Sequence, residues 1–266
     1  MNEIKDIEDY KRRLNEKERL IIFKIFDEYS KKELSFSIKN NITHERATTL
    51  FTKEPLTISW IRNFDNKSIF FDIGANIGVY SLYAALIKDI QVISFEPESK
   101  NFQTLIENIL INKLSSKISA YPIGISDKTE FSSLYISQFT FGGSHHSIGE
   151  YPTNLQTSEP IKTDVKQGIF TTSLNDFLIK WDMEIPNYIK VDVDGIEHKI
   201  FNQADKILGN KNLKSILVEI NEKRPEDKLI LNKLLKYDFK IDYKQMNNVK
   251  KNIQFNKDYV EYLFCR

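Results

Sequence analysis

Acidic residues follow apolar runs at several points of this sequence, in patterns that suit ligand binding. The clearest is in residues 70–85, FFDIGANIGVYSLYAA, where Asp72 and Gly74 end one apolar run and Gly78 precedes another. A strand, a glycine turn and a helix in this order form half of a nucleotide-binding βαβ unit. Because glycine has no Cβ, such a turn can be tight and its backbone N–H groups can approach a ligand closely.

A second acid, Glu96, ends the next apolar run, residues 91–97. It follows Gly74 at roughly the 20-residue spacing at which an acid meets a pair of ribose hydroxyls. The glycine spacing, Asp-x-Gly-x-x-x-Gly, is not the G-x-G-x-x-G of dinucleotide-binding proteins. Turn, helix, strand and acid together indicate an adenosine-type ligand, and the alternative is a turn whose glycines serve packing alone.

Polar residues also follow a later apolar run, residues 188–193, which contains Lys190 and Asp192 and precedes Asp194. Ligands of open α/β sheets bind at the carboxyl ends of the strands. Asp192 and Asp194 have the same parity along the strand, so they can face one site. For Lys190 the alternative is a strand residue whose amine reaches solvent.

Residues 137–160 form a long polar segment that contains the adjacent pair His145 and His146. Loops of this length are commonly functional, and a histidine can act as a general base near neutral pH. We expect a substrate loop here, with solvent-exposed histidines as the alternative. Asp192, Glu219 and Asn221 could converge on a divalent metal, and structural carboxylates explain the same residues. A divalent metal therefore stays open, and we assign no metal site.

The elements that position these residues alternate between strands and helices, which predicts a mainly parallel sheet covered on both faces. The predicted strands are 68–73, 91–97, 117–123, 130–136, 161–172, 188–193, 213–220, 239–243 and 259–264. The predicted helices are 79–87, 99–112, 173–181, 196–208 and 225–237. The last two strands, joined by a short non-helical connection, predict an antiparallel edge.

The first 53 residues do not share this alternation. Apolar residues at helical spacing over residues 1–35 predict one or two helices, which would cap the core or form a homodimer. Residues 36–53 show no clean pattern, and Pro55 can begin a short helix, 56–64. We therefore expect an N-terminal helical extension, 1–53, and a core domain, 54–266.

The composition is that of an ordinary globular protein, with 266 residues, 41% hydrophobic and 28% charged. A net charge of +1 gives no global attraction to nucleic acid or to an anionic membrane. The single cysteine, Cys265, excludes an intramolecular disulfide framework. Because we see neither a signal-peptide pattern nor a membrane-spanning run, we expect a cytoplasmic protein.

The pattern as a whole resembles class I S-adenosylmethionine-dependent methyltransferases, and six segments narrow the resemblance to the FkbM-type family. They run in the family's order from about Glu54 to Asn221: EPLTISWIRNF, FFDIGANIGVYSLYAA, SFEPESKNFQTLIENI, IGISDK, TTSLNDFL and IKVDVDGIEHKIFNQA. There is one departure. The family usually has Asp-x-Glu-Gly, and here Asp194 supplies a carboxylate that is one methylene shorter.

The resemblance implies a Rossmann-like, seven-stranded, mostly parallel sheet and methylation of a hydroxyl on a sugar, glycan or small metabolite. It implies that S-adenosylmethionine is held at its methionine end by Asp72, Gly74, Ala75, Asn76 and Gly78, at its ribose by Glu96, and at its adenine by Ser126 and Asp127. The candidate catalytic residues are Asp192 first, then Asp194, Lys190, His145 and His146.

Alternatives to this function and to one of these roles stay open. Asp127 can instead be a turn-forming residue. The whole chain can instead be a cofactor-binding scaffold without turnover. A nicotinamide-dependent oxidoreductase is disfavoured by the glycine spacing.

Overall fold

The computed structural model describes residues 20–151, 160–193, 195–221, 223–250 and 260–266. In this part of the chain a seven-stranded sheet has the order β12-β13-β11-β10-β3-β4-β5. Its parallel strands are β3 (Ile69–Ile73), β4 (Gln91–Phe95), β5 (Ile118–Tyr121), β10 (Tyr188–Val191) and β11 (Ser215–Ile220). The strand β13 (Val260–Cys265) is antiparallel to both β11 and β12 (Lys240–Ile241), so the predicted antiparallel edge is confirmed.

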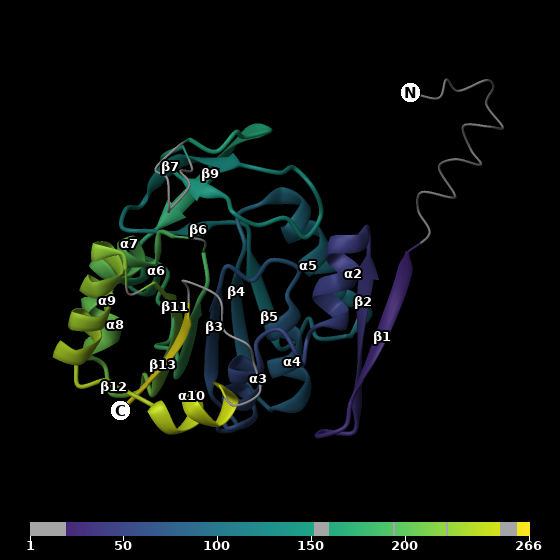
Figure 1. Ribbon diagram of the computed structural model, residues 1–266, viewed down its shortest axis with the longest axis horizontal. Helices are drawn as coiled ribbons and strands as arrows, with labels where there is room; N and C mark the ends of the chain where they lie inside the picture. The colour runs from purple at the N-terminus through teal and green to yellow at the C-terminus, as the bar shows by residue number, and fades with distance from the viewer. Residues whose placement is uncertain (1–19, 152–159, 194, 222, 251–259) are drawn as a thin grey trace.

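Helices cover both faces of this sheet (Figure 1). The helices of the described residues are α2 (Asn41–Thr48), which packs on the N-terminal strands, α3 (Pro55–Arg62), α4 (Val79–Ile87), α5 (Ser99–Ile111), α6 (Leu174–Lys180), α7 (Glu197–Asn202), α8 (Asp205–Gly209), α9 (Pro225–Lys236) and α10 (Tyr243–Lys250). In β3 the ring of Phe70 contacts Trp60 of α3, and the ring of Phe71 contacts Phe177 of α6. Since successive side chains of a strand point to opposite faces, α3 and α6 lie on opposite sides, and Asp72 is on the α3 side.

A second, smaller sheet closes the region beyond the carboxyl ends of the central strands. It consists of β6 (Gly124–Ile125), β9 (Val165–Thr172), β7 (Glu130–Ile136) and β8 (Ser147–Ile148), in that order. Figure 1 shows it above the large sheet. Leu134, Ile136 and Ile169 form a buried cluster with Ile196, which precedes α7. The extra strand predicted over 130–136 is confirmed, and the strand predicted over 161–172 begins at Val165.

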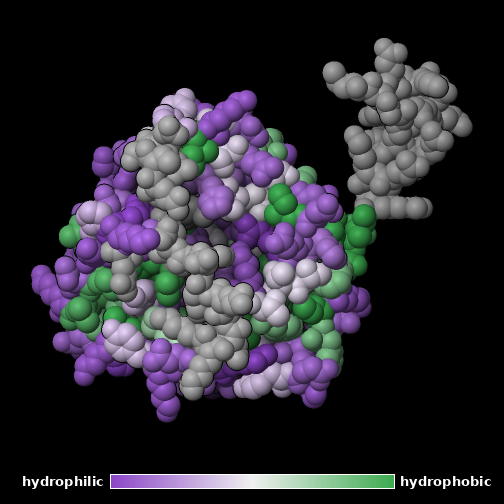
Figure 2. All heavy atoms as spheres, in the orientation of Figure 1, coloured by the Kyte–Doolittle hydropathy of each residue, from purple (hydrophilic) through white to green (hydrophobic). Residues whose placement is uncertain are grey.

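The N-terminal segment is not helical where it is described. Residues 21–38 form an antiparallel hairpin, β1 (Ile21–Asp27) and β2 (Lys32–Ile38), so the predicted helices are wrong there, and residues 1–19 lie outside the described part. The side chains of β2 alternate between buried Leu34 and Phe36 and less buried Glu33 and Ser35. This two-residue period is that of a strand and not of a helix. Figure 2 shows an apolar strip over β1, formed by exposed Leu20, Ile21, Ile22 and Phe26.

Side chains of α5 hold this hairpin against the core. The amide oxygen of Asn108 accepts the Ser37 N–H at 2.7 Å, and the side chain of Asn112 bonds both the N–H and the carbonyl of Ser35. The asparagines therefore satisfy backbone groups of β2 that no further strand pairs. Helix α2 follows, begun by a capping box in which Asn40 and Thr43 bond each other's backbone N–H.

Two further differences concern helices near the C-terminus. The single helix expected over 196–208 is broken, because Asn175 of α6 sits in the break, donating its N–H to the Gln203 carbonyl and accepting the Lys206 N–H. The connection expected to be non-helical contains α10, which Asp242 caps by accepting the Gln245 N–H at 2.9 Å.

Candidate active site

The carboxyl ends of β3 and β10 lie side by side at the point where the sheet order reverses. From β3 the chain continues outward to β4, and from β10 it continues to β11 on the other side. Such a switch point is where open α/β sheets bind ligands. Gly74 follows β3 with φ of +84°, and a Cβ on it would lie 1.9 Å from the carbonyl oxygen of Asp192, which follows β10. Glycine is therefore required for the two strand ends to meet.

On one side of this turn lies a mostly apolar pocket, which we call the apolar pocket. Its apolar walls come from strand ends of both sheets and include Ile73, Phe95, Ile123, Ile125, Leu134 and Ile148. Polar groups are few, and Glu96, Asn76 and His146 are among them. A pocket with apolar walls and a few placed polar groups suits a flat heterocycle that carries hydroxyls.

Glu96 is 5% exposed and is fixed by the backbone around it. One carboxylate oxygen accepts the Asn76 N–H and the other accepts the Glu98 N–H, both at 2.8 Å. Burial raises the pKa of Glu96 to about 7, although these hydrogen bonds oppose the increase. Each oxygen keeps a second lone pair, so the carboxylate can still accept two hydroxyl donors from a ligand.

The N–H groups of the glycine turn are used within the protein. Gly74 and Ala75 both donate to the carbonyl of Phe95 at 3.0 Å, and Gly78 donates to the carbonyl of Ala75 at 2.8 Å. These groups are therefore not the free donors that the sequence suggested. What the turn offers a ligand is space, since no side chain projects from Gly74.

The described part of the expected substrate loop closes over the turn. The carbonyl of Gly143 accepts the side-chain amides of Asn76 at 2.7 Å and Asn101 at 3.0 Å. His146 lines the apolar pocket, and both its ring nitrogens are buried without a partner among the described residues. Burial lowers its pKa to about 4, so the ring is neutral at pH 7. His145 is exposed and is not among the residues that line this pocket.

On the other side of the turn lies a second pocket, which we call the charged pocket. Its charged lining residues are Arg46, Lys53, Glu54, Lys190 and Asp192. It is also lined by Tyr80 of α4 and by Gly74 and Asn76 of the turn. Gly74, Asn76 and Asp192 line both pockets, so the two pockets meet there.

Lys190 is 3% exposed and organises the inner end of the charged pocket. Its ammonium lies 2.7 Å from Asp192 and 3.5 Å from Glu54, and 5.0 Å from the centre of the Tyr80 ring. Burial favours the neutral amine, but the surrounding carboxylates outweigh it and hold the pKa of Lys190 well above its usual value. The alternative for Lys190, an amine that reaches solvent, is therefore wrong.

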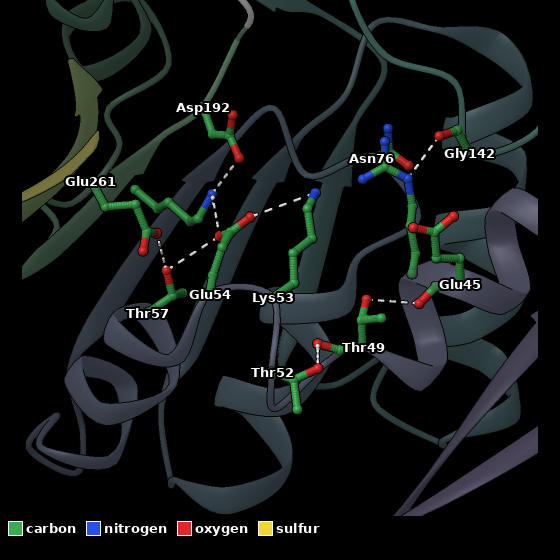
Figure 3. A network of polar contacts seen from close by, with 12 residues as sticks. Glu45, Thr49, Thr52, Lys53, Glu54, Thr57, Asn76, Gly142, Asp192 and Glu261 are labelled. Carbon is green, nitrogen blue, oxygen red and sulfur yellow. Dashed lines mark hydrogen bonds and ion pairs between the residues drawn. The ribbon is translucent and has the colours of Figure 1, made fainter. Parts of the chain in front are cut away.

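Asp192 lies next to the Lys190 ammonium, and its pKa shifts in the opposite direction. Burial by itself would raise its pKa, but Lys190 outweighs burial and keeps the pKa below its usual value. Figure 3 shows Asp192, Glu54 and Glu261 converging on this region from different elements. Burial raises the pKa of Glu261 well above its usual value, and Thr57 donates to it at 2.5 Å. Asp192 is thus an ionised carboxylate at the boundary between the two pockets.

Three other predicted residues line neither pocket. Asp72 accepts the Ser81 hydroxyl at 2.5 Å beneath the turn, and burial raises its pKa. Neither pocket's lining includes it, nor Ser126 or Asp127; the apolar pocket is lined instead by Ile123, Gly124 and Ile125, which precede them. Asp194 lies outside the described residues.

Sequence reasoning missed the side chains that reach the site from other elements. These are Arg46, Lys53, Glu54 and Tyr80 in the charged pocket and Asn101 in the apolar one. No local pattern marks them, because their role depends on which helix packs beside the strand ends. Within the described residues, no group of three or more histidine, cysteine, aspartate or glutamate side chains is placed to hold a metal ion. None of the described helices is long and apolar enough to cross a membrane.

Solved structures resemble this one at low sequence identity. Precorrin-6y C5,15-methyltransferase from Geobacter metallireducens shares 10% identity and a TM-score of 0.46, over 83% of this chain and 92% of its own. An rRNA methylase from Streptococcus thermophilus shares 11% identity and a TM-score of 0.45, over 86% and 98%. TrmK of M. capricolum, bound to S-adenosylhomocysteine, shares 10% identity and a TM-score of 0.43, over 79% and 66%. At these TM-scores the likenesses carry no argument about activity.

The assignment rests instead on the sequence. No curated relative matches the chain. The family model of the methyltransferase FkbM domain matches residues 72–241, which is more than half of the chain and contains the glycine turn, Glu96 and Asp192. The chain therefore belongs to the FkbM family of S-adenosylmethionine-dependent methyltransferases.

Proposed function

We propose that this protein transfers the methyl group of S-adenosylmethionine to a hydroxyl oxygen of a sugar, a glycan or another small metabolite. The observation that carries the proposal is the meeting of the apolar and charged pockets at Gly74, Asn76 and Asp192. A donor with its adenosine in the apolar pocket and its methionine end at the glycine turn would place its methyl group near this boundary, beside Asp192. S-adenosylmethionine supplies a methyl group carried on a positively charged sulfur.

The residues of the apolar pocket fit an adenosine group. Its apolar walls match a purine ring, and the Glu96 carboxylate has acceptor capacity for two ribose hydroxyls. The two ring nitrogens of His146 have no partner among the described residues. Buried polar atoms are nearly always hydrogen-bonded, so this neutral ring is suited to a polar edge of the bound molecule. We assign His146 to binding on this side rather than to proton abstraction.

Methyl transfer from sulfur to oxygen is an in-line displacement in which the carbon–sulfur bond breaks as the carbon–oxygen bond forms. The protein's main contributions are alignment and exclusion of water. The acceptor hydroxyl must also lose its proton as the new bond forms. We assign that proton to the Asp192 carboxylate, which is ionised and lies at the boundary. The Lys190 ammonium, at 2.7 Å, holds this carboxylate in place.

The same contact supports the alternative function, a protein that binds the cofactor without turnover. A carboxylate whose pKa is lowered by a buried ammonium is a weaker base than a free one. The alternative therefore keeps the apolar pocket as a binding site and removes the catalytic role of Asp192.

The test combines calorimetric titration of the full chain with S-adenosylhomocysteine and incubation with methyl-labelled S-adenosylmethionine and a panel of sugars, sugar acids, sugar phosphates and polyols. Binding together with label transfer to a hydroxyl supports the proposal. Binding with no transfer to any member of the panel supports the alternative. Failure to bind S-adenosylhomocysteine contradicts both functions.

A further inference from the structure

One wall of the apolar pocket is a loop, residues 139–146, whose backbone is fastened by side chains of other elements. We call it the roof loop. We propose that Asn101 and Asn40 are positioning residues that hold the roof loop closed over the bound cofactor, so that the cofactor and its product exchange only when the loop is released. This inference rests on the proposed function for the place of the cofactor in the apolar pocket.

The roof loop faces the strand ends across the apolar pocket. Gly143, Ser144 and His146 of the loop line the pocket. Opposite them, Ile73 ends β3 and Phe95 ends β4, and both line the same pocket. A ligand in the pocket would therefore lie between the strand ends of the large sheet and the roof loop.

Asn101 of α5 makes the central fastening of the roof loop, and it is only 1% exposed. Its side-chain oxygen accepts the Gly142 N–H at 2.8 Å, and its side-chain amide donates to the Gly143 carbonyl at 3.0 Å. Gly142 and Gly143 are themselves buried, so their peptide groups need hydrogen-bond partners within the protein. One asparagine side chain supplies a partner to both residues.

Asn40, which begins α2, fastens the loop from another side. Its side-chain amide donates to the Thr140 hydroxyl and to the Phe141 carbonyl, both at 2.9 Å. The loop also approaches α2 closely, since a Cβ on Gly142 would lie 3.1 Å from Cγ2 of Ile42. The roof loop is therefore seated between the start of α2 and α5.

Asn76 connects the roof loop to the acid expected at the ribose. Its backbone N–H donates to Glu96 at 2.8 Å, and its side-chain amide donates to the Gly143 carbonyl at 2.7 Å. Figure 3 shows Asn76 beside Gly142 of the loop. The closed loop is thus held against the ribose side of the pocket.

The roof loop is held by polar contacts, whereas the strands on either side of it are held by apolar ones. Its rings, Phe139 and Phe141, lie 3.7 and 5.2 Å from the Lys100 ammonium and belong to neither apolar cluster of the described residues. Ile136 of β7 and Ile148 of β8 belong to a buried cluster. Water can replace side-chain hydrogen bonds when a loop opens, but it cannot replace apolar burial. Release of the roof loop should therefore leave β7 and β8 in place.

The first experiment measures association and dissociation of S-adenosylhomocysteine with the full chain by stopped-flow fluorescence. Asn101→Ala removes both of its bonds to the loop, so the dissociation and association rate constants should each rise about tenfold. Both rise because the open loop becomes more populated in the free and in the bound protein, so the dissociation constant should change less than about threefold. Asn63→Ala is the matched control, because the Asn63 amide donates to Ser59 of its own helix, and its rates should equal those of the wild type.

Asn40→Ser tests the inference even where Asn101→Ala fails to fold. Serine can still accept the Thr43 N–H as the cap of α2, but it lacks the amide that bonds the loop. Its two rate constants should rise about three- to tenfold. Unchanged rates in this variant overturn the inference. A faster dissociation with an equal loss of affinity also overturns it, because that is the behaviour of a direct contact with the cofactor.

Hydrogen exchange of the protein without cofactor separates this inference from the proposed function. Peptides that span residues 139–146 should exchange about tenfold faster in Asn101→Ala, and the rest of the chain should exchange as in the wild type. Faster exchange throughout the chain, with a lower melting temperature, would show a merely structural role and overturn the inference. Failure of the wild type to bind S-adenosylhomocysteine contradicts the proposed function and leaves the fastening of the loop, measured by exchange, standing.

Discussion

The two pockets beside the glycine turn are built from different kinds of interaction. The apolar pocket is walled by strand ends of the two sheets, and its buried acid, Glu96, is held by backbone N–H groups. The charged pocket contains three cations and two carboxylates, supplied by α2, the start of α3 and the end of β10. Burial of apolar side chains shapes the apolar pocket, and pairing of opposite charges shapes the charged pocket.

The family model covers the residues of the two pockets unequally. All the apolar walls named above belong to the region that the family model matches, whereas Arg46, Lys53 and Glu54 precede it. Asp192 lines both pockets, as Gly74 and Asn76 do. Substitutions can therefore be chosen to affect both pockets, one pocket, or neither.

The largest effect is expected from Gly74→Ala, which affects both pockets. The new Cβ would meet the Asp192 carbonyl at 1.9 Å, in a backbone conformation with φ of +84°. We expect the free energy of unfolding to fall by about 2–4 kcal/mol, as overpacking and backbone strain add. Urea denaturation measures it. Gly168→Ala is the control, because nothing lies within 4 Å of its added Cβ. Equal stability of the two variants would contradict the close approach of β3 and β10.

Asp192→Asn should separate chemistry from binding. The amide cannot take the hydroxyl proton, so kcat should fall about 100-fold or more, while the dissociation constant of S-adenosylhomocysteine changes by less than about threefold. Steady-state kinetics and calorimetry give the two values. Asp238→Asn, an exposed partner of Lys211, is the control. A larger loss in cofactor affinity than in kcat would move Asp192 from the acceptor side to the cofactor side.

Glu96→Ala should affect the apolar pocket alone. Removing an acceptor of two ribose hydroxyls should weaken S-adenosylhomocysteine binding about 10- to 100-fold, corresponding to roughly 1.5–3 kcal/mol. Unaltered cofactor affinity would show that the ribose lies elsewhere.

The smallest effect is expected from pH. Burial raises the pKa of Glu197 to about 7, and its carboxylate accepts the N–H groups of Val193 and Gly195 next to the site. An acid with a raised pKa in the folded state stabilises the fold at low pH, and that contribution is lost as pH rises through about 7. The free energy of unfolding should therefore fall between pH 5 and pH 8, by about 1–2 kcal/mol from this residue. Glu197→Gln should flatten the profile by that amount in denaturant titrations; an unchanged slope would contradict the assignment.

The local sequence pattern predicts a helix or strand correctly where all the residues that form it lie in one short stretch. The helix predicted over 79–87 is α4, and the strands before and after it differ from prediction by no more than two residues at either end. The helix predicted over 173–181 is α6, which Ser173 caps by accepting the Asp176 N–H. The pattern does not predict the hairpin β1–β2, because its widely spaced apolar residues also fit a helix and the alternation around buried Leu34 and Phe36 is short.

The sequence by itself determined the unit of strand, glycine turn, helix and acid, since apolar periodicity, the absence of a Cβ at Gly74 and the distance to Glu96 are properties of one short stretch. The tertiary structure alone decided that N–H groups of the glycine turn donate to carbonyl groups of the protein, and that Asp72 accepts a hydrogen bond from Ser81. It also decided that α2 brings Arg46 to the boundary where Asp192 and Lys190 pair. The physical reason is that charge pairing and pocket lining depend on which surfaces pack together, and residues more than a hundred positions apart leave no local signal of that contact.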